Sequence, residues 1–335
     1  MGSPAARNHL RLVTLVVVLV VVSYSLWWGD DLLVHTFRPL HNTPQGGDAE
    51  AIPKKIWYKL GPNGLNNDTQ AWTDTCILNN TAYEVDFMSD MSADAFVQDT
   101  FNVTHPTLVE TYFGLQGSYG TALSFMNVWT SDSQLTSAVP ILKADLLRYL
   151  LLYSHGGVYL DLDVSCETPM DEWIPSEYKH DIGLVVGWEF DIGWGDNIIR
   201  EFVTWAMMAK PDSPHLWRVV EDILAFFEDT MAKNSVPVQG LTLAMVGDVV
   251  DATGPRRFTR SIIESMGESF HVKIEAFHNL LTPKLVGDVL VLPGYAWAAS
   301  ANKYHDVLDT VPPPSLSHHY AGSWKNDKGG ETAEG

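Results

Sequence analysis

One stretch of this 335-residue chain is especially informative about structure: Lys143-Ala-Asp-Leu-Leu-Arg-Tyr-Leu-Leu-Leu-Tyr-Ser-His-Gly-Gly-Val-Tyr-Leu-Asp-Leu-Asp163. Its first part repeats leucine at helical spacing, which predicts an amphipathic helix. Gly156 and Gly157 are expected to end that helix, because glycine readily adopts the left-handed conformation found at helix ends. From Val158 onward apolar and polar residues alternate, which predicts a strand with two different faces. The stretch therefore predicts a helix, a glycine turn and a strand.

Two carboxylates stand at the end of the predicted strand. Asp161 and Asp163 are two residues apart and are expected to project from the same strand face. Two like charges placed there suggest a cation held by both, and Mn²⁺ or Mg²⁺ binds through one or two carboxylates plus substrate phosphates. Open α/β sheets bind ligands just outside the carboxyl ends of their strands. A nucleotide diphosphate with its metal is thus the favoured ligand, and a pair of solvated turn aspartates is the alternative.

The preceding helix carries a charged pair of its own. Asp145 and Arg148 are three residues apart and therefore share one helix face. This second pair favours a functional site over two solvated aspartates. Arg148 would add positive potential near the phosphates of such a ligand.

Residues 144–163 resemble the signature of glycosyltransferase family 32, whose members share a DXD motif and include fungal Golgi α-1,6-mannosyltransferases. Three further segments extend the resemblance: Ile52–Lys59 resembles the opening strand of the family, Thr253–Pro255 a late Thr-Gly-Pro loop, and His318–Lys325 the closing segment. Together these segments span nearly all of residues 51–325. The resemblance implies an α/β fold of the GT-A type, with a mostly parallel central sheet and helices on both faces.

The resemblance also implies an activity. It indicates a metal-dependent, retaining glycosyltransferase that moves mannose from GDP-mannose to a mannose-containing acceptor, such as the outer chain of an N-glycan, with an α-1,6 linkage. One alternative is mannosyl or galactosyl transfer to a sphingolipid such as inositol phosphoceramide. Another is a non-catalytic subunit of a mannosyltransferase complex, against which the intact carboxylates argue, because a scaffold has no need of them.

Individual residues receive roles from the same comparison of motifs. The expected catalytic residues are Asp145, Arg148, Asp161 and Asp163. The expected nucleotide-sugar contacts are Trp57, Tyr58, Asp145, Arg148, Gly157, Tyr159, Asp161, Ser323 and Trp324. The expected ligands of Mn²⁺ or Mg²⁺ are Asp161 and Asp163 with a histidine, His319 being the first choice and His318 the second. For Trp57, a buried core tryptophan is the alternative.

Other segments predict further elements of the catalytic domain. Residues 53–60 and 287–293 are expected to form strands, and residues 201–209 and 216–227 surface helices. A buried strand is predicted at 182–186, and the acids that follow it, Glu189 and Asp191, are candidates for contacting acceptor hydroxyls. Solvated loop acids are the alternative for these two residues.

The N-terminal segment predicts a membrane anchor. Leu12 to Trp28 form a run of 17 almost uninterrupted apolar residues, close to the roughly 20 of a spanning helix. Arg7 and Arg11 precede the run, which places the N-terminus in the cytosol. A short span suits a single-pass type II protein of the Golgi membrane, and a cleaved signal peptide is the alternative. The predicted order is cytosolic tail 1–11, signal-anchor 12–28, stem 29–50, lumenal catalytic domain 51–325 and disordered tail 326–335.

Composition and modification signals agree with a lumenal domain. The net charge of −20, from 21 basic and 41 acidic residues, argues against nucleic acid as a partner. Glycosylation sequons begin at Asn67, Asn79 and Asn102. Cys76 and Cys166 can form one disulfide in an oxidising compartment, and two buried free thiols are the alternative.

Overall fold

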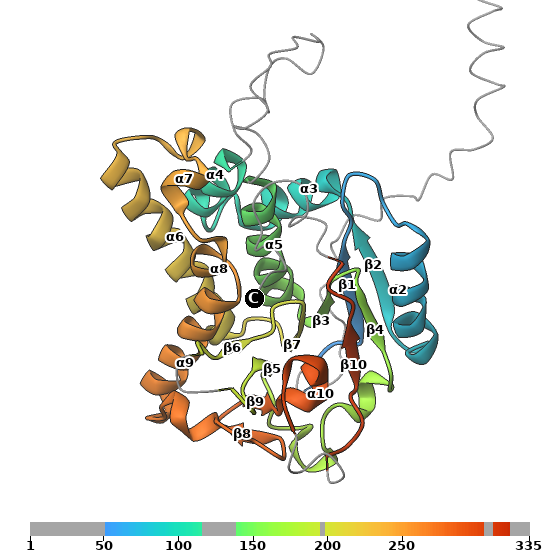
Figure 1. Cartoon of the computed structure of the whole chain (residues 1–335). Helices are drawn as coiled ribbons and strands as arrows, with labels where there is room; N and C mark the ends of the chain where they lie inside the picture. The colour runs from blue at the N-terminus through green and yellow to red at the C-terminus, as the bar shows by residue number, and fades with distance from the viewer. Residues whose placement is uncertain (1–50, 116–138, 195–197, 305–310, 322–335) are drawn as a thin grey trace, which may run out of the picture. The chain divides into compact units, whose positions relative to one another are not determined.

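The computed structural model describes residues 51–115, 139–194, 198–304 and 311–321 (Figure 1). The chain divides into the units Met1–Ala49 and Glu50–Gly335, and every described residue belongs to the second. The predicted tail, anchor and stem lie outside the described residues, as do Ser323, Trp324 and the C-terminal tail. Within the part that is described, no helix is long and apolar enough to cross a membrane.

The described residues fold around an eight-stranded sheet. Its order is β2 (Glu84–Met88), β1 (Lys55–Lys59), β3 (Gly157–Leu160), β7 (Ala206–Ala209), β5 (Leu184–Phe190), β9 (Val289–Leu292) and β8 (Lys284–Val286), with β6 (Glu201–Phe202) beside β5. A separate antiparallel ribbon pairs β4 (Val164–Cys166) with β10 (Leu316–His318). The predicted strands at 53–60, 182–186 and 287–293 are thus confirmed as β1, β5 and β9.

The sheet is mixed, and the prediction of a mostly parallel sheet is wrong for its pairing. β1 pairs in parallel with β2 and β3, and β5 with β9, but β7 runs antiparallel to both β3 and β5. The predicted helix at 201–209 is in fact strands β6 and β7. Residues 202–209 are all buried, so the segment lacks the polar alternation that identifies a half-exposed strand.

Helices cover both faces of the sheet, as predicted. One core contains side chains of β3, β5, β7 and β9 packed against α3 (Asp90–Phe101), α4 (Pro106–Gly114), α5 (Val139–His155), α6 (Pro214–Asn234) and α9 (Pro255–Phe270). The opposite core packs against α2 (Asn67–Asn79), α10 (Gly294–Ala298) and the β4–β10 ribbon. Tyr159 belongs to the first core and its neighbours Val158 and Leu160 to the second, which confirms the predicted alternation.

Shorter helical elements complete the unit and lie mostly in its connections. The two short α-helices are α7 (Leu243–Val246) and α8 (Val249–Ala252), and the 3-10 turns are η1 (Met170–Glu172), η2 (Ser176–Tyr178), η3 (Val238–Gly240), η4 (Ile274–Phe277) and η5 (Ala299–Ala301).

Two glycines join α5 to β3 as the sequence predicts. Gly156 has a φ of +65° and donates its backbone N–H to the carbonyl of Leu152 at 2.9 Å, which ends the helix. Gly157 has a φ of +98°, and a Cβ at this position would lie 2.6 Å from the carbonyl oxygen of Lys55. Because Gly157 starts β3, at the end opposite Asp161, its prediction as a nucleotide-sugar contact is wrong. Its positive φ and its lack of a side chain allow β1 and β3 to lie close together.

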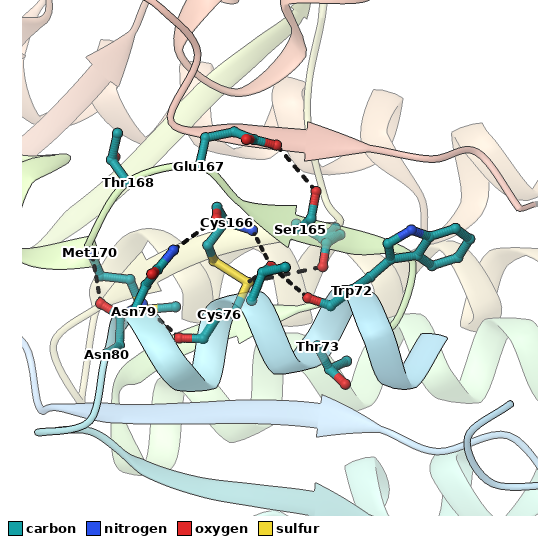
Figure 2. Close-up of a disulfide and its surroundings, with 12 residues drawn as sticks. Trp72, Thr73, Cys76, Asn79, Asn80, Ser165, Cys166, Glu167, Thr168 and Met170 are labelled. Atoms are coloured by element: carbon teal, nitrogen blue, oxygen red, sulfur yellow. Dashed lines mark hydrogen bonds between the residues drawn. A yellow bond between two sulfur atoms is a disulfide. The ribbon is translucent and has the colours of Figure 1, made fainter. Parts of the chain in front are cut away.

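A disulfide joins Cys76 of α2 to Cys166 of β4, which confirms the pairing (Figure 2). The amide of Asn79 donates to the carbonyl of Cys166 at 3.0 Å, and the N–H of Cys166 donates to Thr75 Oγ1 at 2.9 Å. β4 begins directly after Asp163. The bridge therefore fastens one side of the turn that carries the two predicted metal ligands.

Removing this bridge should destabilise the fold without adding a polar group to the core. We expect the Cys76→Ala/Cys166→Ala variant to lose about 2–4 kcal/mol of unfolding free energy, because the bridge restricts the unfolded chain. Urea unfolding followed by circular dichroism measures this loss. Under reducing conditions the variant and the wild-type protein should unfold at similar urea concentrations. Equal midpoints in the absence of reductant would contradict the expectation.

Candidate active site

The two aspartates lie where β3 ends. β3 stops at Leu160, and Asp161 and Asp163 stand on the turn that leads to β4, so the prediction that both project from one strand face is wrong. The N–H of Asp161 donates to the carbonyl of Trp205 at 2.9 Å. Trp205 directly precedes β7, so the turn is fixed at the edge of the sheet where β3 ends, the location predicted for a ligand site.

Arg148 of α5 connects the helix to this turn. Its Nη2 donates to Asp145 Oδ1 at 2.7 Å, and its Nη1 donates to the carbonyl of Thr204 at 2.7 Å. Nη1 also lies 3.9 Å from Asp161 Oδ2. Thr253, between α8 and α9, donates its hydroxyl to Asp145 Oδ2 at 2.7 Å. The predicted pair on one helix face is confirmed, and it forms a buried network that reaches Asp161.

Burial and charge act in opposite directions within this network. Burial raises the pKa of Asp145, and Arg148 and the Thr253 hydroxyl offset only part of that effect. Burial alone would lower the pKa of Arg148, but Asp161, Tyr159 and Asp145 outweigh it and raise the pKa above its ordinary value. Arg148 therefore stays charged. Arg148 thus places a permanent positive charge close to the turn that carries Asp161.

Tyr159 holds Asp161 from a second direction. Its hydroxyl donates to Asp161 Oδ1 at 3.0 Å, and the Arg148 guanidinium lies 5.2 Å from the centre of its ring. Burial, followed by the charge of Asp161, raises the pKa of Tyr159 well above its ordinary value, so the phenol remains a hydrogen-bond donor. Tyr159 is 2% exposed and is placed to position the carboxylate of Asp161.

Asp163 is held by the closing segment of the chain. Its Oδ1 lies 3.3 Å from His318 Nε2, and its Oδ2 accepts the N–H of Ala321 at 3.0 Å. Burial alone would raise the pKa of Asp163, but His318 and the Ala321 N–H more than offset this and lower it. The ring of His318 stacks on Trp205 at 4.6 Å. His318 and Asp163 thus form one side of the site.

His319 faces a different neighbourhood, so the preference for His319 over His318 is wrong. Its ring stacks on Trp72 of α2 at 4.2 Å, and its Nε2 lies 2.9 Å from Ser165 Oγ. Successive residues leaving a strand point to opposite sides. Since His318 points toward Asp163, His319 points toward α2.

The donor atoms at the turn fit a hard divalent cation whose ligand shell is completed by substrate. Within the described residues, no group of three or more His, Cys, Asp or Glu side chains forms a metal site by itself. The side chains of Asp161 and Asp163 are 31% and 18% exposed, so both are partly open to solvent. Mg²⁺-type ions typically use one or two carboxylates together with phosphate oxygens and waters, which matches what this turn offers.

Comparison with known proteins agrees with this geometry. Residues 68–179, from α2 through the turn with both aspartates, match the family described as "Glycosyltransferase sugar-binding region containing DXD motif". The chain is similar to this family over residues 68–179. The matched region contains Asp145, Arg148 and both aspartates of the turn, and the resemblance noted for residues 144–163 is confirmed.

Curated relatives of this chain include proteins named as mannosyltransferases. It is 28% identical over 284 residues to the initiation-specific alpha-1,6-mannosyltransferase of Schizosaccharomyces pombe, covering 82% of this chain and 64% of that one. It is 26% identical over 312 residues to the Candida albicans protein of the same name, covering 84% and 74%. A shorter match, 44% over 52 residues, covers 15% of this chain and 16% of inositol phosphoceramide mannosyltransferase 1 of Schizosaccharomyces pombe. The chain thus spans 64% of the length of the first relative.

The two aromatic residues predicted to bind the nucleotide are core residues of this fold. Trp57 is 2% exposed, and its indole N–H donates to the carbonyl of Gly156 at 2.9 Å. Tyr58 is fully buried and stacks on Phe87 of β2. The alternative interpretation of Trp57 as a core tryptophan is therefore confirmed. Both side chains pack against neighbouring layers of the fold.

The two predicted acceptor contacts have different outcomes. Asp191 is fully buried, accepts the N–H of Asn279 at 2.8 Å and lies 3.4 Å from Arg200 Nε. It is therefore a structural residue and neither a solvated acid nor an acceptor contact. Glu189 is half-buried near the end of β5, and its charge acts on Tyr320 beside Asp163.

Three residues of the site were not predicted from sequence as site residues. Thr253 lies in the Thr-Gly-Pro segment on which part of the resemblance rested, so a signal for it was present. Thr204 and Trp205 supply the carbonyls that fix Arg148 and Asp161. They lie in a segment predicted to be a helix, and no sequence signal identified them.

Proposed function

We propose that this protein is a divalent-metal-dependent, retaining α-1,6-mannosyltransferase of the GT-A type, which transfers mannose from GDP-mannose to a mannose-containing glycan. The observation that carries the proposal is the turn with Asp161 and Asp163, held by Arg148 and His318 at the end of β3, in a chain similar to α-1,6-mannosyltransferases over most of its length. The mixed α/β sheet supports the fold type. The intact contacts among Asp145, Arg148 and Asp161 argue against a non-catalytic subunit.

Each residue of the turn has a part in this mechanism. Asp161 and Asp163 would hold Mn²⁺ or Mg²⁺ together with substrate phosphate oxygens, and His318 would keep Asp163 in position. The ion would neutralise charge that develops on the departing diphosphate. Tyr159 and Arg148 keep the carboxylate of Asp161 in place before substrate arrives, which avoids reorganisation during the reaction. The buried charge of Arg148 adds positive potential under the diphosphate. The acceptor hydroxyl attacks the face that the diphosphate leaves, so the α configuration is kept.

Nucleotide binding and transfer together test this proposal. With Mn²⁺ present, GDP at about a hundred times its dissociation constant should stabilise the protein by about 2.7 kcal/mol, and UDP much less. GDP-mannose with α-linked mannotriose should give a tetrasaccharide with a new α-1,6 linkage. Thermal unfolding and linkage analysis are the measurements. Stronger protection by UDP would favour galactosyl transfer, and absence of both protection and transfer would favour the non-catalytic subunit.

A second candidate is transfer to a sphingolipid. The match to an inositol phosphoceramide mannosyltransferase supports it, although that match covers only 15% of this chain. Mannosylation of inositol phosphoceramide by the protein, with mannotriose left unchanged, would favour this candidate over the glycan acceptor.

We further propose that the catalytic domain lies in the Golgi lumen and that residues 12–28 attach it to the membrane as a single-pass type II anchor. The disulfide and the surface positions of Asn67, Asn79 and Asn102 support an oxidising, glycosylating compartment. Carbonate extraction should leave the protein in the membrane, and endoglycosidase should increase its gel mobility. The Asn79→Gln variant should change the pattern least, because the Asn79 amide lies against Cys166. A soluble, unglycosylated protein would overturn this location.

A further inference from the structure

Tyr320 is a large aromatic residue in an uncommon backbone conformation beside the active site. Its φ is +48°, a region that bulky residues seldom adopt and that clusters at functional positions. Tyr320 is 46% exposed, so burial of its ring in the core does not explain why the backbone adopts this conformation. Its ring lies edge-on to His318 at 4.1 Å, and the next residue, Ala321, donates its N–H to Asp163. Tyr320 therefore stands at the rim of the metal-binding turn.

Polar groups from two other parts of the chain surround its phenol. Ser300, in the η5 turn, is hydrogen bonded to it. The charges of Glu189 and Asp163 also act on this phenol. Elements far apart in sequence thus converge around one half-exposed ring.

This combination has the chemistry of a sugar-binding subsite. An aromatic ring offers an apolar face to the C–H groups of a pyranose, while its hydroxyl contacts water or a polar group. Carboxylates accept hydrogen bonds from sugar hydroxyls, and serine and tyrosine hydroxyls both donate and accept them. Ligand sites commonly combine an aromatic wall with a few polar groups that fix orientation.

We propose that Tyr320 forms the platform for the acceptor pyranose, with Glu189 and Ser300 contacting its hydroxyls, next to the donor site at Asp161 and Asp163. This inference rests on the proposed mannosyl transfer and names the residue that positions its acceptor. Glu189 was a candidate acceptor contact from sequence, whereas Tyr320 had no assigned role.

Two variants of Tyr320 test the contributions of its ring and its hydroxyl separately from that of the backbone conformation. Asn tolerates positive φ, so Tyr320→Asn removes the ring while retaining the conformation, and Tyr320→Phe removes only the hydroxyl. With GDP-mannose and mannotriose as substrates, Tyr320→Asn should raise the acceptor KM about tenfold, with donor KM and melting temperature changed little. Tyr320→Phe should raise the acceptor KM less. The control Met91→Ala trims another exposed side chain, 74% exposed on α3, and should leave both KM values unchanged.

The outcomes distinguish this inference from the proposed function. Wild-type transfer together with an unchanged acceptor KM in Tyr320→Asn would overturn the platform and leave the mannosyltransferase intact. A rise in donor KM equal to that of the acceptor would also overturn it, because the residue would then serve the donor site. No transfer by the wild-type protein would overturn the proposed function itself.

Discussion

Replacing Asp161 or Asp163 with Asn is expected to lower Mn²⁺-dependent mannosyl transfer about a thousandfold or more, while the fold remains intact. Asn has nearly the same shape as Asp but lacks the charge that holds a hard cation. The Asp161 side chain is 31% exposed and that of Asp163 18%, so neither substitution leaves a cavity in the core. Transfer should be measured with saturating Mn²⁺ and GDP-mannose, and thermal unfolding should be recorded for each variant.

A matched control for these variants lies on the same edge of the sheet. Asp90 is exposed and paired with Lys59 on the surface, so Asp90→Asn removes a comparable charge away from the turn and should keep wild-type activity. Wild-type rates in Asp161→Asn and Asp163→Asn at saturating Mn²⁺ would remove the metal assignment from this turn.

The second large effect is expected at Arg148. Arg148→Met leaves the carboxylate of Asp145 buried without its charged partner, which typically destabilises a protein by about 3–5 kcal/mol. Loss of Nη1 also frees the carbonyl of Thr204 and removes the positive charge near Asp161. Urea unfolding should show the loss of stability, and mannosyl transfer should fall because Asp161 is no longer held in place.

Two further variants determine whether the unpaired charge of Asp145 causes the expected loss of stability in Arg148→Met. The double variant Asp145→Asn/Arg148→Met should recover much of the lost stability, because it leaves no unpaired charge, but it should not recover activity. Arg148→Lys should recover little of either property, since one ammonium cannot reproduce the forked contacts to Asp145 and Thr204. A single Arg148→Met variant as stable as the wild-type protein would contradict the role of the network.

Local patterns account for the part of the fold and site that the sequence predicted. The helix, glycine turn and strand of residues 143–160 follow from spacing within the segment. The contact between Asp145 and Arg148 follows from helix geometry in the same way. The Cys76–Cys166 bridge was one of two alternatives, because pairing depends on α2 lying against β4.

Features that depend on distant neighbours were not predictable in this way. Whether His318 or His319 faces the site depends on the register of β10 against β4, where His318 pairs with Val164. Trp57 has the composition of a ligand-stacking residue, and only the layers packed over β1 show that it is buried. β7 is covered on both faces, so its sequence does not distinguish a strand from a helix.

The β4–β10 ribbon has a consequence for the order in which the nascent protein matures. Asp163 and Ala321 are 158 residues apart, and His318 also emerges from the ribosome long after Asp163. The two cysteines, 90 residues apart, are both available much earlier, when the turn with Asp161 and Asp163 has just been made. Oxidation can therefore anchor that turn to α2 while translation continues. A polypeptide released before Leu316 would contain both acids and the disulfide but would lack His318, which holds Asp163.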